Sequence, residues 1–192
     1  MKMYESHFFS KKLSTNVDLA YVPTKALEKD FNSLGFNKIV SFKDGSSLKN
    51  FNKNSQKNKF ALRKELELPK DKCLLLVVGR FIKKKGMDEL FDFRKYLVNK
   101  TNLIDLVFVG SKSSKNRYHL KAKEEKMIVR KWTDHEELKK YYLSCDILVK
   151  PQIGSKTDAL YGGIGSTTIE SLSCGLPTIA FSLYHFTGTL SE

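Results

Sequence analysis

The sequence has few cysteines and no long apolar run. Its three cysteines, Cys73, Cys145 and Cys174, are odd in number, widely spaced and embedded in apolar segments. We therefore expect buried thiols rather than disulfides, and no structural zinc. The longest purely apolar run, Cys73 to Val78, is too short to span a bilayer, and the N-terminus lacks the apolar core of a signal peptide. These absences predict a cytoplasmic protein.

Acidic residues are also scarce relative to basic ones. The chain has 34 Lys and Arg but 21 Asp and Glu, which gives a net charge of +13. Such an excess favours anionic partners: nucleic acid, acidic lipid head groups or nucleotide diphosphates. The lysines are not interleaved with aromatic residues, and no zinc finger, aromatic RNA-binding signature or helix-turn-helix is present. We expect no nucleic-acid partner. A solvated lysine-rich surface and peripheral attraction to the inner face of an acidic membrane both stay open.

Several common catalytic motifs are missing. The sequence has no Gly-x-Gly-x-x-Gly after a strand, no Gly-x-x-x-x-Gly-Lys-Ser/Thr loop and no Gly-x-Ser-x-Gly elbow. Dehydrogenase, P-loop ATPase and α/β-hydrolase interpretations therefore lack support. The four histidines, at positions 7, 119, 135 and 185, have no partner at metal or triad spacing, and we expect them at the surface or near helix caps.

The pattern of apolar residues divides the chain into two parts. Residues 1–48 contain a strand at Val17–Val22, a helix at Lys25–Leu34 and a strand at Lys38–Phe42. The polar run from Lys49 to Lys59 has linker composition, so we place a boundary there and assign residues 49–192 to a second domain.

Strands and helices alternate along the second part. Strands are predicted at 74–78, 103–109, 127–129, 147–149 and 178–181, and helices at 61–67, 87–99, 114–126 and from Thr133, which forms a capping box with Glu136. Alternation at this spacing implies a parallel sheet with helices on both faces. The fold class is α/β, and this part is one Rossmann-like half.

A glycine-rich loop opens the last predicted helix. Gly162-Gly163-Ile164-Gly165-Ser166-Thr167 precedes a short helix with Glu170, and Cys174-Gly175-Leu176-Pro177 turns into the final strand. Backbone N–H groups at such a helix start are unpaired, and the helix dipole favours negative charge. We predict that Gly163, Ile164, Gly165, Ser166 and Thr167 bind phosphate.

Two further loops fall at the carboxyl ends of strands, where open α/β sheets gather ligands. Gly79, Arg80 and Lys85 follow the strand ending at Val78, and two cations there could neutralise a diphosphate. The alternative is that the run Lys83–Lys85 is a solvated loop. Lys131 and Trp132 follow the strand ending at Val129; the tryptophan borders a nucleotide base or only packs.

Three blocks together resemble the donor-nucleotide domain of family 4 glycosyltransferases, which have the GT-B fold. They are Val78-Gly79-Arg80 through Lys85-Gly86, Tyr141 through Pro151, and the glycine loop through Pro177. The resemblance implies a Rossmann-like half of a GT-B fold preceded by a remnant of the other half. It implies transfer of a sugar from a nucleoside-diphosphate sugar to a carbohydrate or lipid-linked hydroxyl, with no cofactor and no metal.

The resemblance also assigns roles to residues. Arg80 and Lys85 correspond to the catalytic pair that grips the donor diphosphate and stabilises the leaving group, and Glu170 to the carboxylate that accepts ribose hydroxyls. From the residues alone, Glu170 could instead close a capping box with Thr167.

The chain departs from the family at one carboxylate and at both ends. Gly162 stands where the family has its first Glu, which contacts the donor sugar, and Asp158 is the nearest acidic residue. We expect the chain to be truncated at both ends and inactive in transfer on its own. The alternative is a non-catalytic remnant or a nucleotide-sugar-binding subunit that needs a partner chain with the acceptor domain.

Overall fold

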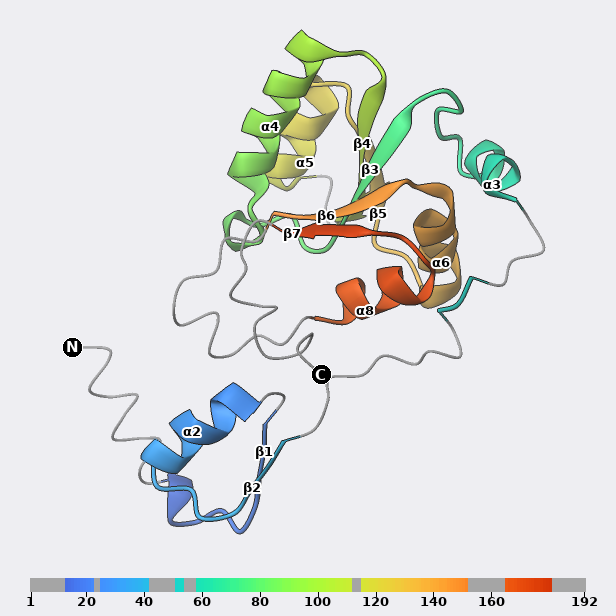
Figure 1. Ribbon diagram of the computed structural model, residues 1–192. Coiled ribbons are helices and arrows are strands. Elements are labelled where there is room, and N and C mark those ends of the chain that lie inside the picture. The colour runs from blue at the N-terminus through green and yellow to red at the C-terminus, as the bar shows by residue number, and fades with distance from the viewer. Residues whose placement is uncertain are drawn as a thin grey trace. The chain divides into compact units, whose positions relative to one another are not determined.

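The computed structural model describes residues 13–22, 25–41, 51–53, 58–111, 115–151 and 165–180. They form two compact units (Figure 1). Of the helices and strands that the structure describes, the first unit holds β1, α2 and β2, and the second holds the later ones.

The first unit is a strand, helix and strand. β1 (Ala20–Val22) pairs in parallel with β2 (Ile39–Ser41), and α2 (Lys25–Ser33) connects them. Ala20 and Val22 are buried while Tyr21 between them is exposed, the alternation expected of a strand with one covered face. The two strands and the helix predicted here are confirmed, although the first strand begins at Ala20 and not at Val17.

The second unit contains a five-stranded sheet in which every neighbouring pair is parallel. Its order is β5-β4-β3-β6-β7. β4 and β5 therefore extend the sheet on one side of β3, and β6 and β7 extend it on the other, so the strand order reverses between β3 and β6. The strands are β3 (Cys73–Val78), β4 (Ile104–Ser111), β5 (Ile128–Lys131), β6 (Ile147–Lys150) and β7 (Thr178–Ala180). This order is that of a Rossmann fold, in which ligands bind at the carboxyl ends of the strands near the reversal.

Helices cover both faces of this sheet, as predicted. α4 and α5 pack on one face, and α3, α6 and α8 on the other (Figure 1). Alternate residues of β3 divide between the two cores, Leu74 and Leu76 in one and Leu75 and Val77 in the other, and all four are buried. The helices are α3 (Lys59–Glu65), α4 (Met87–Lys100), α5 (Arg117–Glu124), α6 (His135–Ser144) and α8 (Ser166–Ser173), and a 3-10 turn η1 (Lys83–Lys85) precedes α4.

Side-chain caps fix where several helices begin. Asn58 Oδ1 accepts from Ala61 N at 2.8 Å, and Asn116 Oδ1 accepts from Tyr118 N at 2.9 Å. At α6 the cap is Asp134, whose Oδ1 accepts from Glu137 N at 2.8 Å. The predicted cap of Thr133 with Glu136 is therefore wrong by one residue, because a carboxylate is also a favoured N-cap and the Asp134–Glu137 pair has the same spacing.

Asp146, at the start of β6, ties together segments far apart in the sequence. Its Oδ2 accepts from Arg63 Nη2 and from Leu74 N, both at 2.6 Å, and Oδ1 accepts from Lys59 Nζ. The Arg63 side chain is 4% exposed and also donates to the carbonyls of Ser144, Lys70 and Lys72. This Arg63–Asp146 cluster joins α3, β3 and the end of α6.

The three cysteines are free thiols; Cys145 and Cys174 are buried, and Cys73 is partly buried. Within the described part of the chain, no helix combines the length and apolarity needed to cross a membrane.

Candidate functional site

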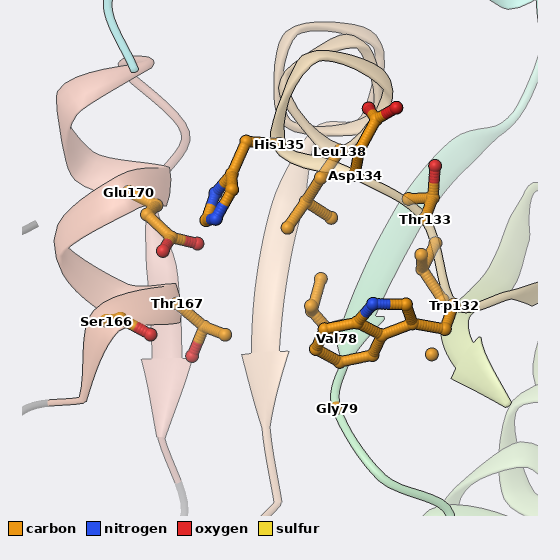
Figure 2. Close-up of a pocket in the computed structure, with 12 residues that line it drawn as sticks. Val78, Gly79, Trp132, Thr133, Asp134, His135, Leu138, Ser166, Thr167 and Glu170 are labelled. Carbon is orange, nitrogen blue, oxygen red and sulfur yellow. The ribbon is translucent and has the colours of Figure 1, made fainter. Parts of the chain in front are cut away.

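A pocket of about 130 Å³ lies at the carboxyl ends of β3, β4 and β5 (Figure 2). Val78 and Gly79 come from the end of β3, and Val109 and Gly110 from β4. The loop after β5 and the start of α6 supply a second wall, and α8 supplies the third. The pocket therefore occupies the sheet edge at which the sequence predicted a ligand.

Two glycines let the backbone of adjacent strands border the pocket. Gly79 has φ 145° and Gly110 has φ 122°, conformations that favour glycine. A Cβ on Gly110 would lie 2.5 Å from the carbonyl oxygen of Gly79, so the two strand ends could not approach as they do. A Cβ on Gly79 would meet no heavy atom within 4 Å, so a ligand has room to approach the backbone there.

The second wall joins an exposed indole to a helix N-terminus. Trp132 is 61% exposed and lines the pocket with Thr133, Asp134 and His135. Figure 2 shows Trp132 on the far side of the pocket from α8. Because α6 begins at His135, its N-terminus and the positive end of its dipole lie beside the cavity, although the Asp134 carboxylate already accepts from one N–H group of the first turn, that of Glu137.

α8 contributes Ser166, Thr167 and Glu170 to the third wall. The helix begins at Ser166, so Thr167 lies inside its first turn and not at its N-cap. The Glu170 carboxylate is 4% exposed and extends toward α6 (Figure 2), where its Oε2 accepts a 2.8 Å hydrogen bond from Tyr142 Oη. Glu170 thus bonds to the Tyr142 hydroxyl and not to the backbone of Thr167, as the alternative capping box would require.

Tyr142, in α6, is the residue that the sequence did not point to. Burial raises the pKa of its phenol far above the usual value, and the neighbouring Glu170 charge raises it further. The phenol is therefore a neutral hydrogen-bond donor at all working pH values. The nearest signal in the sequence was the Tyr141-Tyr142 pair, but a sequence does not show which helix face meets which carboxylate.

The structure gathers some of the predicted site residues and not others. Gly79, Trp132, Ser166, Thr167 and Glu170 line one cavity. Four other predicted residues are described by the structure but do not line the cavity: Gly165, Arg80, Lys85 and Lys131. Gly165 directly precedes α8, and Arg80 is exposed next to Gly79. Lys85 is half-buried at the end of η1, and Lys131 is exposed at the end of β5. The predicted residues Gly163 and Ile164, together with Asp158 and Gly162, lie outside the described residues.

Of the two histidines that the structure describes, one is exposed and the other is buried. His135 is exposed at the first position of α6, as expected, although it also lines the pocket. His119 is not at the surface, since it is only 6% exposed, but it lies in the first turn of α5, three residues after the Asn116 cap, which the prediction also allowed. Burial lowers the pKa of its imidazole, and the charges of Lys123 and Lys131 lower it further. His7 and His185 lie outside the described residues.

No group of three or more His, Cys, Asp or Glu residues suited to a metal ion occurs in the ranges that the structure describes. The residues that line the pocket offer the N-termini of α6 and α8, the hydroxyls of Thr133, Ser166 and Thr167, the His135 imidazole, and the carboxylates of Asp134 and Glu170. Such a set suits a phosphorylated ligand carrying hydroxyl groups.

The fold is that of a Rossmann-like unit with a pocket at the carboxyl edge of its sheet, and comparison with known proteins identifies its family. The model of the glycosyl transferases group 1 family matches residues 58–190, so the chain belongs to this family. Its fold is that of the Rossmann-like half of a GT-B glycosyltransferase.

A protein of Klebsiella pneumoniae, described as an uncharacterized 41.2 kDa protein in the cps region, is 28% identical over 131 residues, which are 67% of this chain and 33% of that protein. Sucrose-phosphate synthase from Thermosynechococcus elongatus superimposes with a TM-score of 0.67 and 23% identity, over 91% of this chain and 43% of that one. HepE from Anabaena, solved with UDP-glucose, superimposes with a TM-score of 0.66 and 14% identity, over 85% of this chain and 44% of the HepE chain. The chain thus spans a third to under half the length of these proteins.

Proposed function

We propose that the pocket binds a nucleoside-diphosphate sugar and that the chain forms the donor-binding half of a glycosyltransferase. The observation that carries the proposal is the meeting of two helix N-termini, of α6 and α8, with the buried carboxylate of Glu170 at the carboxyl edge of the sheet. Membership of the glycosyl transferases group 1 family supports the same conclusion.

The diphosphate is proposed to lie at the start of α8. Ser166 and Thr167 bring hydroxyl donors to the cavity, and the free N–H groups and dipole of the helix favour an anion there. Arg80, directly after Gly79, and Lys85, at the end of η1, are proposed to supply positive charge from the loop that follows β3. Arg offers a planar fork of donors, whereas Lys offers a compact charge.

The nucleoside is proposed to lie between α8 and the loop after β5. Glu170 can accept two hydrogen bonds from vicinal hydroxyls, which suits a ribose. Trp132 presents an exposed aromatic face across the pocket, which suits a base. Lys131, the preceding residue, would add charge at the rim.

In the proposed reaction the bond between the sugar and the diphosphate breaks while the acceptor oxygen bonds to the anomeric carbon, and the proton of the acceptor hydroxyl passes to the departing diphosphate or to water. Negative charge grows on the departing diphosphate, and Arg80, Lys85 and the α8 N-terminus would stabilise it without a metal or other cofactor. The proposed acceptor is a carbohydrate or lipid-linked hydroxyl, held beside the donor by the whole protein or complex in which this unit works.

Titration calorimetry with UDP, GDP and ADP tests the donor site. Removing either cation, in Arg80→Ala or Lys85→Ala, should weaken binding by about 1.5 to 3 kcal/mol, the scale of a hydrogen bond to a charged group. Lys100→Ala is a matched control, because Lys100 ends α4 and so lies near the amino ends of the strands. Wild-type affinity in both site variants would remove the cation assignment, and no binding of any of the three nucleotides would remove the proposed function.

A further inference from the structure

We propose that Tyr142 is a positioning residue of the donor site, whose hydroxyl fixes the Glu170 carboxylate so that the site selects nucleotides with ribose hydroxyls. The inference rests on the proposed function and adds to it a residue outside the pocket lining. Tyr142 does not touch the ligand in this proposal, and it acts through Glu170 alone.

The geometry joins the two side chains across neighbouring helices. Tyr142 lies in α6 and Glu170 in α8, and the distance from Oη to Oε2 is 2.8 Å. Tyr142 is 1% exposed and Glu170 is 4% exposed, so water competes little for this bond. Glu170 nevertheless borders the cavity, which places the carboxylate between a dry core and the ligand space.

Packing holds the tyrosine ring in one place. The Phe51 ring meets it edge to face at a centroid distance of 5.8 Å, and the same Phe51 meets the His135 ring at 5.4 Å. Phe51 is only 2% exposed, although it lies in the polar run with linker composition. Because the ring is fixed by this packing, the Tyr142 hydroxyl cannot move with the Glu170 carboxylate. Rotation of the carboxylate would therefore break the hydrogen bond, and the bond holds the carboxylate in one orientation.

A phenol has one proton to donate, and burial keeps that proton in place by raising the pKa of Tyr142. It occupies one lone pair of Oε2 and leaves the other oxygen, Oε1, for partners from the cavity. Two hydroxyls on adjacent carbons of a ribose need such an acceptor at a fixed angle, because hydrogen bonds weaken steeply when they are misaligned. A carboxylate without the Tyr142 bond would lose this orientation.

A purely structural role for the same bond is the competing interpretation, since buried polar groups normally find partners. The two interpretations differ in one measurable quantity. A structural bond affects stability and the binding of all ligands alike, whereas a positioning bond affects the preference for ribose over a sugar without its hydroxyls.

The experiment measures the affinity of the full chain for UDP, GDP and ADP by calorimetry, takes the tightest ligand, and repeats the titration with its 2′,3′-dideoxy form. The ratio of the two dissociation constants is the ribose preference. Tyr142→Phe should reduce this ratio by about tenfold, the size expected for a buried charge-assisted hydrogen bond, and leave the dideoxy affinity unchanged. Glu170→Gln should reduce the ratio at least as much, and adding Tyr142→Phe to it should change the ratio no further.

Tyr141→Phe is the matched control, because Tyr141 is the preceding residue of α6 and is buried in the same core. It should keep the wild-type ratio. A full ribose preference in Tyr142→Phe, alongside its loss in Glu170→Gln, would overturn the inference and leave the proposed function standing. Absence of nucleotide binding by the wild-type chain would overturn both.

Discussion

Replacing Asp146 by asparagine should lower the free energy of unfolding by about 3 kcal/mol, because it leaves a buried guanidinium without its counterion. Arg63 is 4% exposed and keeps its three carbonyl acceptors in the variant, but the neutral asparagine no longer balances its charge. Breaking a buried ion pair costs about 3 to 5 kcal/mol, and we take the lower end because the Asp146 side chain is 26% exposed. For a chain of this size the loss corresponds to a fall in Tm of about 6 to 12 °C.

Urea denaturation and thermal scans followed by circular dichroism measure this loss. Glu65→Gln provides the control, since it removes the more exposed ion pair between Glu65 and Lys140 and should change stability by about 0.5 kcal/mol or less. An Asp146→Asn variant as stable as Glu65→Gln would refute the argument that the Arg63–Asp146 cluster supports the second unit.

The pH dependence gives a second check on the same residue. Burial alone would raise the pKa of Asp146, but the hydrogen bonds from Lys59 and the Leu74 amide, with the charges of Lys59 and Arg63, outweigh it and lower the pKa. A carboxyl with a lowered folded pKa stabilises the protein above its unfolded pKa of about 3.9, and this contribution is lost as the pH falls through the folded value. The stability difference between wild type and Asp146→Asn should therefore shrink below about pH 4.

Two other perturbations test local features of the fold. Gly86→Ala should destabilise the second unit by at least about 2 kcal/mol in urea titrations, because φ is 72° and the new Cβ would lie 2.1 Å from the Pro151 carbonyl oxygen; an unchanged midpoint would contradict that contact. Burial raises the pKa of Cys145 to about 12 and of Cys174 to about 11, so at pH 8 both thiols should react with a disulfide reagent much more slowly in the native protein than in urea. Cys73, which is partly buried, should be modified first, and equal native rates at all three positions would count against the packing.

The hydrophobic pattern predicted where the strands and helices lie but not where they stop. The strand expected to end at Val129 continues to Lys131, because parallel pairing with β4 extends the backbone ladder beyond the apolar residues. The helix expected at Ala61–Glu67 begins earlier, at Lys59 after the Asn58 cap, and ends at Glu65. The ends of strands and helices depend on backbone pairing and on polar caps, which the pattern of apolar residues does not indicate.

The motifs likewise predicted which strand ends carry the pocket. Gly79, Trp132 and the start of α8 come from three loops, and parallel topology brings such loops to one edge. The Tyr142–Glu170 hydrogen bond joins residues 28 positions apart on two helices, so it depends on the angle and rotation of each helix. Those quantities follow from side-chain packing and not from motif spacing, which is why the sequence did not indicate Tyr142.

The central position of β3 also determines when the second unit can form during synthesis. β3 is the first of the five strands in the chain, yet β6 must pair along one of its edges. Asp146 likewise follows Arg63 by 83 positions, so the two side chains can meet only after residue 146 has been made. Until residue 150 has left the ribosome, one edge of β3 therefore stays open to other strands, and contacts between such distant segments form slowly. The nascent chain should depend most on chaperones in that interval, and a ribosome stalled just before β6 should expose a segment from Leu74 to Val77 that the completed unit buries on both faces.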